Sequence, residues 1–156
     1  MEKVLNIAAH IAQEYFLEYG QQIDEMKLHK LMYFAQRESL IQNGEALFDA
    51  AFYGWKYGPV LKEIRSVYKD GSFVSIMPER FTKDCSMLLK KVLEKYAGKD
   101  SWSLSRLTHG EISWKNSRIG ISEKENSDNP MSLEDIMADA ERIKARREML
   151  KELGLV

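Results

Sequence analysis

Apolar residues recur every three or four positions through most of this chain, and this spacing limits the fold more than any other feature of the sequence. In the segment 3–19 the apolar positions are Val4, Ile7, Ala8, Ile11, Ala12, Tyr15 and Phe16. Offsets of three and four place side chains on one face of an α-helix. The segment therefore predicts an amphipathic helix. Gly20 predicts its end, because glycine readily adopts the left-handed backbone found there.

The second and the last helix have recognisable start signals. Asp24 can cap a helix over 25–42, and a glycine follows that segment at position 44. Ser132, with an acidic residue three positions later, has the spacing of a capping box before a helix over 133–152. Both segments also carry the apolar spacing, so we expect two long helices.

Three shorter helices are expected between these two. Pro59 suits the first turn of a helix, where its missing N–H costs nothing, and Asp70-Gly71 would stop that helix. Helical spacing also covers residues 83–97. Ser101 can cap a further short helix over 102–109.

Other stretches lack this spacing. Residues 45–58 combine aromatic side chains with glycines and predict an extended segment, and residues 73–76 predict a short strand or a connector. Residues 115–130 are polar and contain Gly120 and Pro130, which predicts a surface loop. We therefore expect an all-α (mainly α) fold: a single compact domain of about six helices with at most one short β-ribbon.

Composition limits the class of protein. A chain of 156 residues can bury about 68–70% of its unfolded surface in one core. The 23 Lys and Arg against 24 Asp and Glu give a net charge of −1, which argues against nucleic acid as the partner. Neither a run of about 18 apolar residues nor a signal-peptide pattern is present, so we expect a cytoplasmic protein away from membranes. The single cysteine, Cys85, excludes an internal disulfide.

The three histidines give little indication of catalysis or metal binding. None has a histidine at metal-site spacing, so we expect no metal and no cofactor. We interpret His10 as solvent-exposed and His29 as packed or hydrogen-bonded. His109 and Glu111 could form a proton relay in a small hydrolase or transferase, which stays open as an alternative. In the simpler interpretation, His109 and Thr108 bond backbone groups at a helix end, and no residue is catalytic.

The last helix alternates charges of both signs, which predicts a solvated face. Its basic and acidic residues are Arg142, Lys144, Arg146, Arg147, Lys151, Glu141, Glu148 and Glu152. Affinity for nucleic acid would need several of the basic side chains on one surface. A nucleic-acid-linked regulatory protein therefore stays a second alternative.

Three segments, in the same order, resemble the Panacea domain of the phage-associated, SocA-like antitoxin family. They are KLHKLMYFAQ at 27–36, WKYGPV at 55–60, and the pattern LS-x-LTH-x-E-x-x-W at 104–114. The sequence departs from the family pattern in three places: His29 stands where a glutamine is usual, Arg37-Glu38 replaces the glycine-aromatic pair that often follows Ala-Gln, and Ser113 stands where a proline commonly precedes the tryptophan. The family positions with an expected structural role are Lys27, Leu28, Leu31, Tyr33, Gln36, Gly58, Pro59, Val60 and Leu107.

The resemblance implies an antitoxin that binds and blocks a cognate protein toxin encoded next to it, rather than an enzyme. It implies a helical domain over 1–118. The residues that follow predict, by their own pattern, a polar loop over 119–131 and a C-terminal helix within 132–156 that packs on the domain or extends it. Whether copies of the chain associate stays open. Aromatic residues dominate interface hot spots, and the expected toxin-binding positions are Phe52, Tyr53, Trp55, Tyr57, Thr108, His109 and Trp114.

Overall fold

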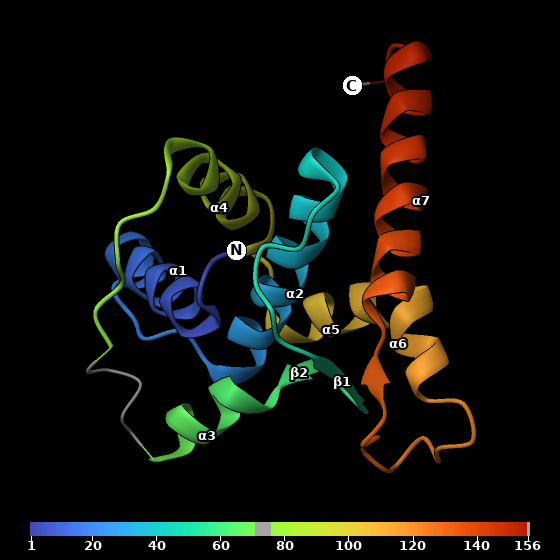
Figure 1. Ribbon diagram of the computed structural model, residues 1–156, viewed down its shortest axis with the longest axis horizontal. Helices are drawn as coiled ribbons and strands as arrows, with labels where there is room; N and C mark the ends of the chain where they lie inside the picture. Colours follow the sequence, from blue (N-terminus) through green and yellow to red (C-terminus); the bar gives the residue numbers. More distant parts are fainter. Residues whose placement is uncertain (71–75, 156) are drawn as a thin grey trace.

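The computed structural model describes residues 1–70 and 76–155, and in these ranges the chain forms seven helices and one small antiparallel sheet (Figure 1). The fold is mainly α with a short β-ribbon, as the sequence predicts. The elements are α1 (Val4–Tyr19), α2 (Glu25–Asn43), β1 (Phe52–Trp55), β2 (Gly58–Leu61), α3 (Lys62–Asp70), α4 (Lys83–Tyr96), α5 (Ser101–His109), α6 (Ile112–Ser117), β3 (Pro130–Met131) and α7 (Leu133–Glu152).

Helix α2 lies at the centre of the molecule, with α1, α4, α5, α7 and β2 packed around it (Figure 1). Every residue from Lys27 to Leu40 is buried, whatever its polarity. The sequence predicts one apolar face on this helix, but its polar face is buried too. Buried polar groups need hydrogen-bond partners, so the partners of the α2 side chains determine much of what surrounds the helix.

Most helix ends agree with the sequence signals. α1 and α2 end at Gly20 and Gly44, both with left-handed φ angles, of 68° and 69°. The Asp24 carboxylate accepts a hydrogen bond from the Lys27 backbone N–H at 2.8 Å. The cap of α5 is Asp100 rather than the expected Ser101, so this helix begins one residue earlier than predicted.

The expected helix start at Pro59 is wrong. Pro59 lies in β2, which pairs with β1 in antiparallel register, with Tyr53 opposite Val60. Helix α3 begins only at Lys62. Strand β2 is an edge of the sheet, whose order is β2-β1-β3, and edge strands tolerate a proline because its missing N–H need not serve a neighbouring strand.

The polar segment 115–130 is less irregular than expected. Helix α6 extends into it as far as Ser117, and at its far end Pro130–Met131 pairs with β1 as the third strand. Of the segment 73–76, Ile76 lies in no strand and residues 73–75 lie outside the described residues, as does Gly71.

Two side chains on α1 differ from the amphipathic pattern, which predicts a buried apolar face and an exposed polar face. Phe16 belongs to the predicted apolar face but is 56% exposed. His10 was expected in solvent but is half-buried, with its ring edge-on to Phe81 at 5.2 Å. Within the described ranges no helix combines the length and the apolar character needed to cross a bilayer.

Helix α7 packs its first half against α2 and α6, while its second half extends past the body of the molecule (Figure 1). Its buried residues are Ile136, Asp139 and Ala140. Further along, Arg147 donates two hydrogen bonds to the Glu38 carboxylate on α2, at 2.9 and 3.0 Å. The prediction of a fully solvated charged face on α7 is therefore wrong at Arg147, which anchors the helix.

Candidate partner-binding site

The three segments that carry the family resemblance meet at the β1–β2 hairpin. The hairpin's tip is Lys56-Tyr57, between the two strands. Helix α2 contacts β2 along one side, α5 contacts β2 as well, and α6 contacts β1. We use the term hairpin face for the surface that these elements form around the tip: Trp55, Lys56, Tyr57, Trp102, His109 and Trp114.

Side chains from elsewhere in the fold bond six main-chain groups of this hairpin. The bonds are Arg118 Nη1 to Gly54 O (2.7 Å), Trp114 Nε1 to Trp55 O (2.9 Å), Lys56 N to Asn126 Oδ1 (3.0 Å), Ser105 Oγ to Tyr57 O (2.6 Å), Lys30 Nζ to Pro59 O (3.4 Å) and Leu61 N to His29 Nδ1 (3.2 Å). The hairpin is thus held mainly through its backbone. Its own side chains are left to face outward or to pack.

Gly58 shows how closely the segments fit. Its φ of 120° lies in a region that other residues rarely adopt. A Cβ at this position would lie 2.6 Å from Lys30 Cε and 2.6 Å from Thr108 Oγ1. Glycine is required here for both reasons. The glycine of the Gly-Pro motif therefore leaves room for the side chains of Lys30 and Thr108 to pack against the strand.

Lys30 brings an ammonium group beneath the hairpin. Its side chain is 1% exposed, and its hydrogen bond to Pro59 O is long. Burial lowers the Lys30 pKa to about 7, although Asp24 and Glu25 act in the opposite direction. Beside it, between the hairpin and α2, lies a hollow of about 330 Å³ that Trp55 and Tyr57 also line. A buried, weakly bonded ammonium therefore lies under the centre of the hairpin face.

His29 has both ring nitrogens engaged, in agreement with its interpretation as a packed, hydrogen-bonded residue. Nδ1 accepts from the Leu61 backbone N–H, so the ring proton lies on Nε2, which is 3.0 Å from the Glu25 carboxylate. Burial lowers the His29 pKa, and the hydrogen bond to Glu25 only partly opposes this. Neutral His29 therefore connects α2 to β2.

His109 and Glu111 do not share a site, although they are two positions apart in the sequence. The His109 ring stacks on Trp114 with a centroid distance of 4.1 Å. Glu111 is buried and instead accepts from Tyr33 OH and from Arg37 Nη1, both at 2.8 Å. The proton relay considered for this pair therefore has no common cavity to act in.

The hydroxyl nearest to His109 does not provide a nucleophile. Ser105 Oγ lies 3.4 Å from His109 Nε2, but it is buried and donates to the Tyr57 carbonyl at 2.6 Å. Cys85 is also buried, and burial raises its thiol pKa to about 11, which leaves little reactive thiolate.

A buried polar network connects α2, α6 and α7 behind the hairpin face. The Asp139 carboxylate on α7 accepts from the backbone N–H groups of Ile112 and Ser113 at 2.6 and 3.0 Å, and from the Ser113 hydroxyl at 2.6 Å. Tyr33 OH lies 3.2 Å from the same carboxylate. Asp139 therefore caps α6 from another helix, which fixes the position of Trp114 on the hairpin face.

Sequence reasoning missed this network, although a signal was present. Two of the departures from the family pattern, Arg37 and Ser113, belong to it: Arg37 Nη2 also donates to Tyr96 OH at 2.9 Å. A proline at position 113 could not donate a backbone N–H to Asp139. Burial raises the pKa of Glu111, even though the Arg37 guanidinium acts to lower it. The Arg37 guanidinium therefore opposes the effect of burial on the Glu111 carboxyl group.

The expected toxin-binding residues fall into two groups. Phe52 and Thr108 are completely buried: Phe52 packs edge-on to Tyr33 at 5.6 Å, and the Thr108 hydroxyl donates to Ser105 O at 2.7 Å. We therefore leave these two out of the surface. Half-buried or exposed positions are Tyr53, Trp55, Tyr57, His109 and Trp114.

The most exposed aromatic residue of the face was not among the expected binding positions. Trp102 is 57% exposed and lies edge-on to Tyr57, which is 44% exposed, at 5.2 Å. The sequence signal for Trp102 was its position on a short, polar helix, where an exposed tryptophan is unusual. Two large aromatic rings thus form a contiguous exposed pair at the hairpin tip.

The comparisons with known proteins agree with this convergence of segments. A family model described as antitoxin SocA-like, Panacea domain, matches residues 28–115, which is more than half of the chain. Searches of curated proteins and of solved structures gave no match. The matched range runs from α2 to α6 and includes all three segments around the hairpin except Lys27, while α1 and α7 lie outside it. The chain belongs to the family of SocA-like antitoxins with a Panacea domain.

Proposed function

We propose that this chain is an antitoxin that neutralises a protein toxin by direct binding, and that the hairpin face is the surface that the toxin covers. The family supports an antitoxin-type role. The observation that carries the choice of surface is the exposed Tyr57–Trp102 pair on a hairpin whose backbone is bonded from several sides. The toxin is expected to be encoded next to this chain.

Aromatic side chains on a rigid support are well suited to protein recognition. Tyrosine and tryptophan are enriched among hot-spot residues, whose truncation costs at least about 2 kcal/mol. A preorganised loop also loses little conformational freedom on binding, so less of the contact energy is spent on ordering. The bonds to Tyr57 O and Trp55 O give the hairpin tip this preorganisation.

Co-expression tests the function itself. The neighbouring open reading frame, expressed alone, is expected to stop growth, and co-expression of this chain is expected to restore it. Co-purification of the two proteins then shows whether rescue acts through a stable complex. Growth arrest that persists in the presence of folded, abundant chain would contradict the proposal.

Truncation of the aromatic pair tests the surface. The double change Tyr57→Ala and Trp102→Ala is expected to weaken toxin binding by about a hundredfold or more, since two hot spots of about 2 kcal/mol each are lost. The melting temperature should change little, because both rings are substantially exposed. Calorimetric titration measures the first quantity and circular dichroism the second.

Phe16→Ala is the matched control, because Phe16 is as exposed as Trp102 but lies on α1. Its toxin affinity should equal that of the unchanged protein. Equal losses in the control and the double variant would place the toxin elsewhere. Loss of rescue on His109→Ala in a protein that still binds the toxin would instead support the enzymatic alternative.

A further inference from the structure

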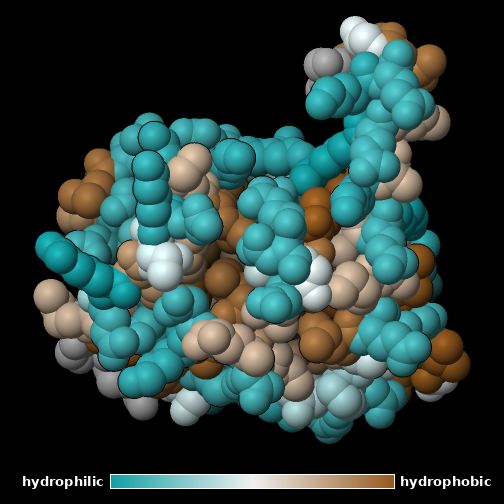
Figure 2. Space-filling view, turned by 45° about the horizontal axis from the view of Figure 1, so that its top comes forward, coloured by the Kyte–Doolittle hydropathy of each residue, from teal (hydrophilic) through white to brown (hydrophobic). Residues whose placement is uncertain are grey.

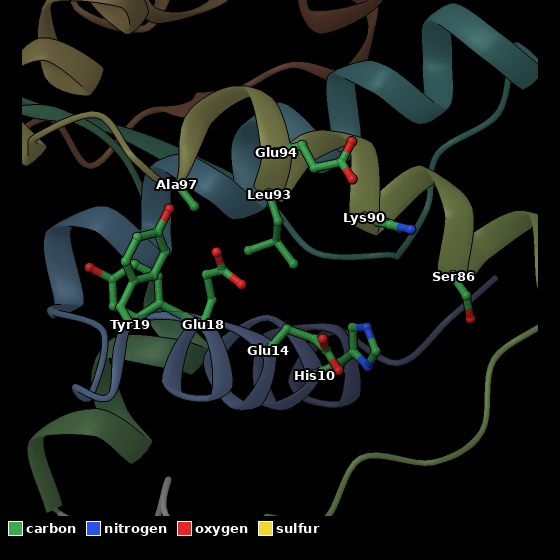
Figure 3. Close-up of a pocket in the computed structure, with 10 residues that line it drawn as sticks. His10, Glu14, Glu18, Tyr19, Ser86, Lys90, Leu93, Glu94 and Ala97 are labelled. Atoms are coloured by element: carbon green, nitrogen blue, oxygen red, sulfur yellow. The ribbon is translucent and has the colours of Figure 1, made fainter.

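A hollow lies away from the hairpin face, between α1 and α4 (Figure 3). Its volume is about 580 Å³. We call it the α1–α4 groove and define it by six of its lining residues: Glu14, Tyr15, Glu18, Leu93, Glu94 and Ala97. Helix α1 lies outside the range that the family model matches, so the family assignment gives this groove no role.

The groove combines an apolar floor with an acidic rim. Tyr15, Leu93 and Ala97 are half-buried or buried, whereas the three glutamates are exposed. Figure 3 shows Glu18 rising from α1 and Leu93 descending from α4 into the space between the helices. With the described part of the chain these three glutamates form no ion pair, and Lys90 is the only lysine or arginine among the lining residues. The groove is thus shaped for an apolar segment that carries positive charge.

The end of α7 is such a segment. Figure 2 shows it standing clear of the body, with hydrophobic side chains at its end. Arg146, Met149, Leu150 and Leu153 have offsets of three, four and seven, which place them on one face of the helix. We call them the tip stripe. Met149 is 53% and Leu153 64% exposed, and apolar surface of this kind at the end of an unsupported helix is typical of an interaction site.

We propose that the tip stripe of one copy docks in the α1–α4 groove of a second copy, and that the exchange is reciprocal, so that the chain forms a twofold dimer. Apolar side chains of the stripe cover the floor of the groove, and Arg146 meets the glutamates of its rim. Arg146 also forms no ion pair within the described part of the chain, unlike the neighbouring Arg147. Both complementary surfaces are therefore present, and unsatisfied, on the same molecule.

Reciprocity follows from the size and the symmetry of the contact. Stable interfaces bury about 1,200–2,000 Å² in total, and two identical helix-end contacts approach this more readily than one. A twofold arrangement also closes the assembly, whereas a one-way contact between tip and groove would continue from copy to copy. The hairpin face takes no part in either contact, so the dimer remains able to bind toxin.

Light scattering after size-exclusion chromatography of the full chain, without toxin, tests the dimer. The unchanged protein is expected to elute as a dimer over a wide range of concentrations. Arg146→Glu, or Glu18→Lys in the groove, should each raise the dimer dissociation constant by about tenfold or more. Both residues are exposed, so circular dichroism should show unchanged folding. Arg146→Glu combined with Glu18→Lys in one chain should restore the dimer.

Lys144→Glu is the matched control, since Lys144 lies two positions from Arg146 on the opposite side of α7. It should leave the dimer intact. A monomer at every concentration, or a dimer that neither single charge reversal weakens, would overturn the proposal. Growth into ever larger oligomers would overturn the reciprocal form. Loss of toxin binding in the single variants, with the unchanged chain monomeric, would assign the tip to the toxin instead.

Discussion

Replacing Arg37 by methionine is expected to lower the free energy of unfolding by about 3–5 kcal/mol, the usual cost of removing one partner from a buried ion pair. The guanidinium is the cation bonded to Glu111, at 2.8 Å, and Asp139 places a second carboxylate close by. Methionine would fill much of the space but leave Glu111 buried without its hydrogen-bonded cation. Urea unfolding followed by circular dichroism measures the loss.

The loss of stability in the Arg37→Met variant should depend on pH. Without the guanidinium, the pKa of Glu111 would lie further above its ordinary value, so the folded variant holds a proton that the unfolded chain releases. Its stability should therefore fall as pH rises above the ordinary glutamate range. Adding Glu111→Gln, which removes the carboxylate, should recover most of the loss and abolish this pH dependence.

Arg142→Met provides the control for the same carboxylate. Arg142 lies 3.8 Å from the same Glu111 oxygen, but about half of its side chain is exposed. Exposed ion pairs contribute about 0–1 kcal/mol, so this change should have little effect. If both arginine variants lost the same stability, burial of the pair would not be the cause.

Replacing Lys30 by methionine should act in the opposite direction and raise the free energy of unfolding at pH 6. The Lys30 pKa falls from 10.5 to about 7 on folding, mainly because of burial. At about 1.4 kcal/mol for each pKa unit, this corresponds to roughly 5 kcal/mol, from which loss of the bond to Pro59 O subtracts about 1 kcal/mol. Methionine has no charge to desolvate, so a gain of roughly 4 kcal/mol is expected.

The pH dependence of the unchanged protein follows from the same pKa. Between about pH 7 and 10.5 the unfolded chain carries a proton on Lys30 that the folded chain has lost, so the free energy of unfolding rises with pH in this window. The Lys30→Met variant should lack this rise, and its advantage should shrink toward pH 10. Unfolding in urea at pH 6, 8 and 10 measures both effects. An exposed control, Lys91→Met, should leave the curve unchanged.

The local signals in the sequence were sufficient for the long helices. The bounds of α1, α2, α4 and α7 follow from apolar spacing, capping residues and terminal glycines, all of which act within a few residues of the chain. Pro59 shows where such signals fail. The same residue suits a helix start and an edge strand, and only the pairing of β2 with β1 decides between them. That pairing is a tertiary contact.

The family resemblance singled out the segment 55–60, which forms most of the hairpin, but it could not separate the buried residues of the hairpin from the exposed ones. Alternation along β1 places Phe52 inside and Tyr53 nearer the surface, and the sequence alone does not say which face is covered. The burial of Lys30 and Arg37 could not be predicted from the sequence, for a related reason. Polar residues on a helix predict a solvent face, whereas α2 is enclosed on every side.

The way the hairpin is held has a consequence for how such a protein could change partners. Because the supporting bonds end on carbonyl and N–H groups that every residue except proline possesses, the architecture does not otherwise fix the identities of Lys56 and Tyr57. The side chains at the tip can therefore be exchanged while the backbone of the hairpin keeps its position. Randomising these two positions together with Trp102 should give a library of stably folded proteins, from which binders of unrelated toxins could be selected.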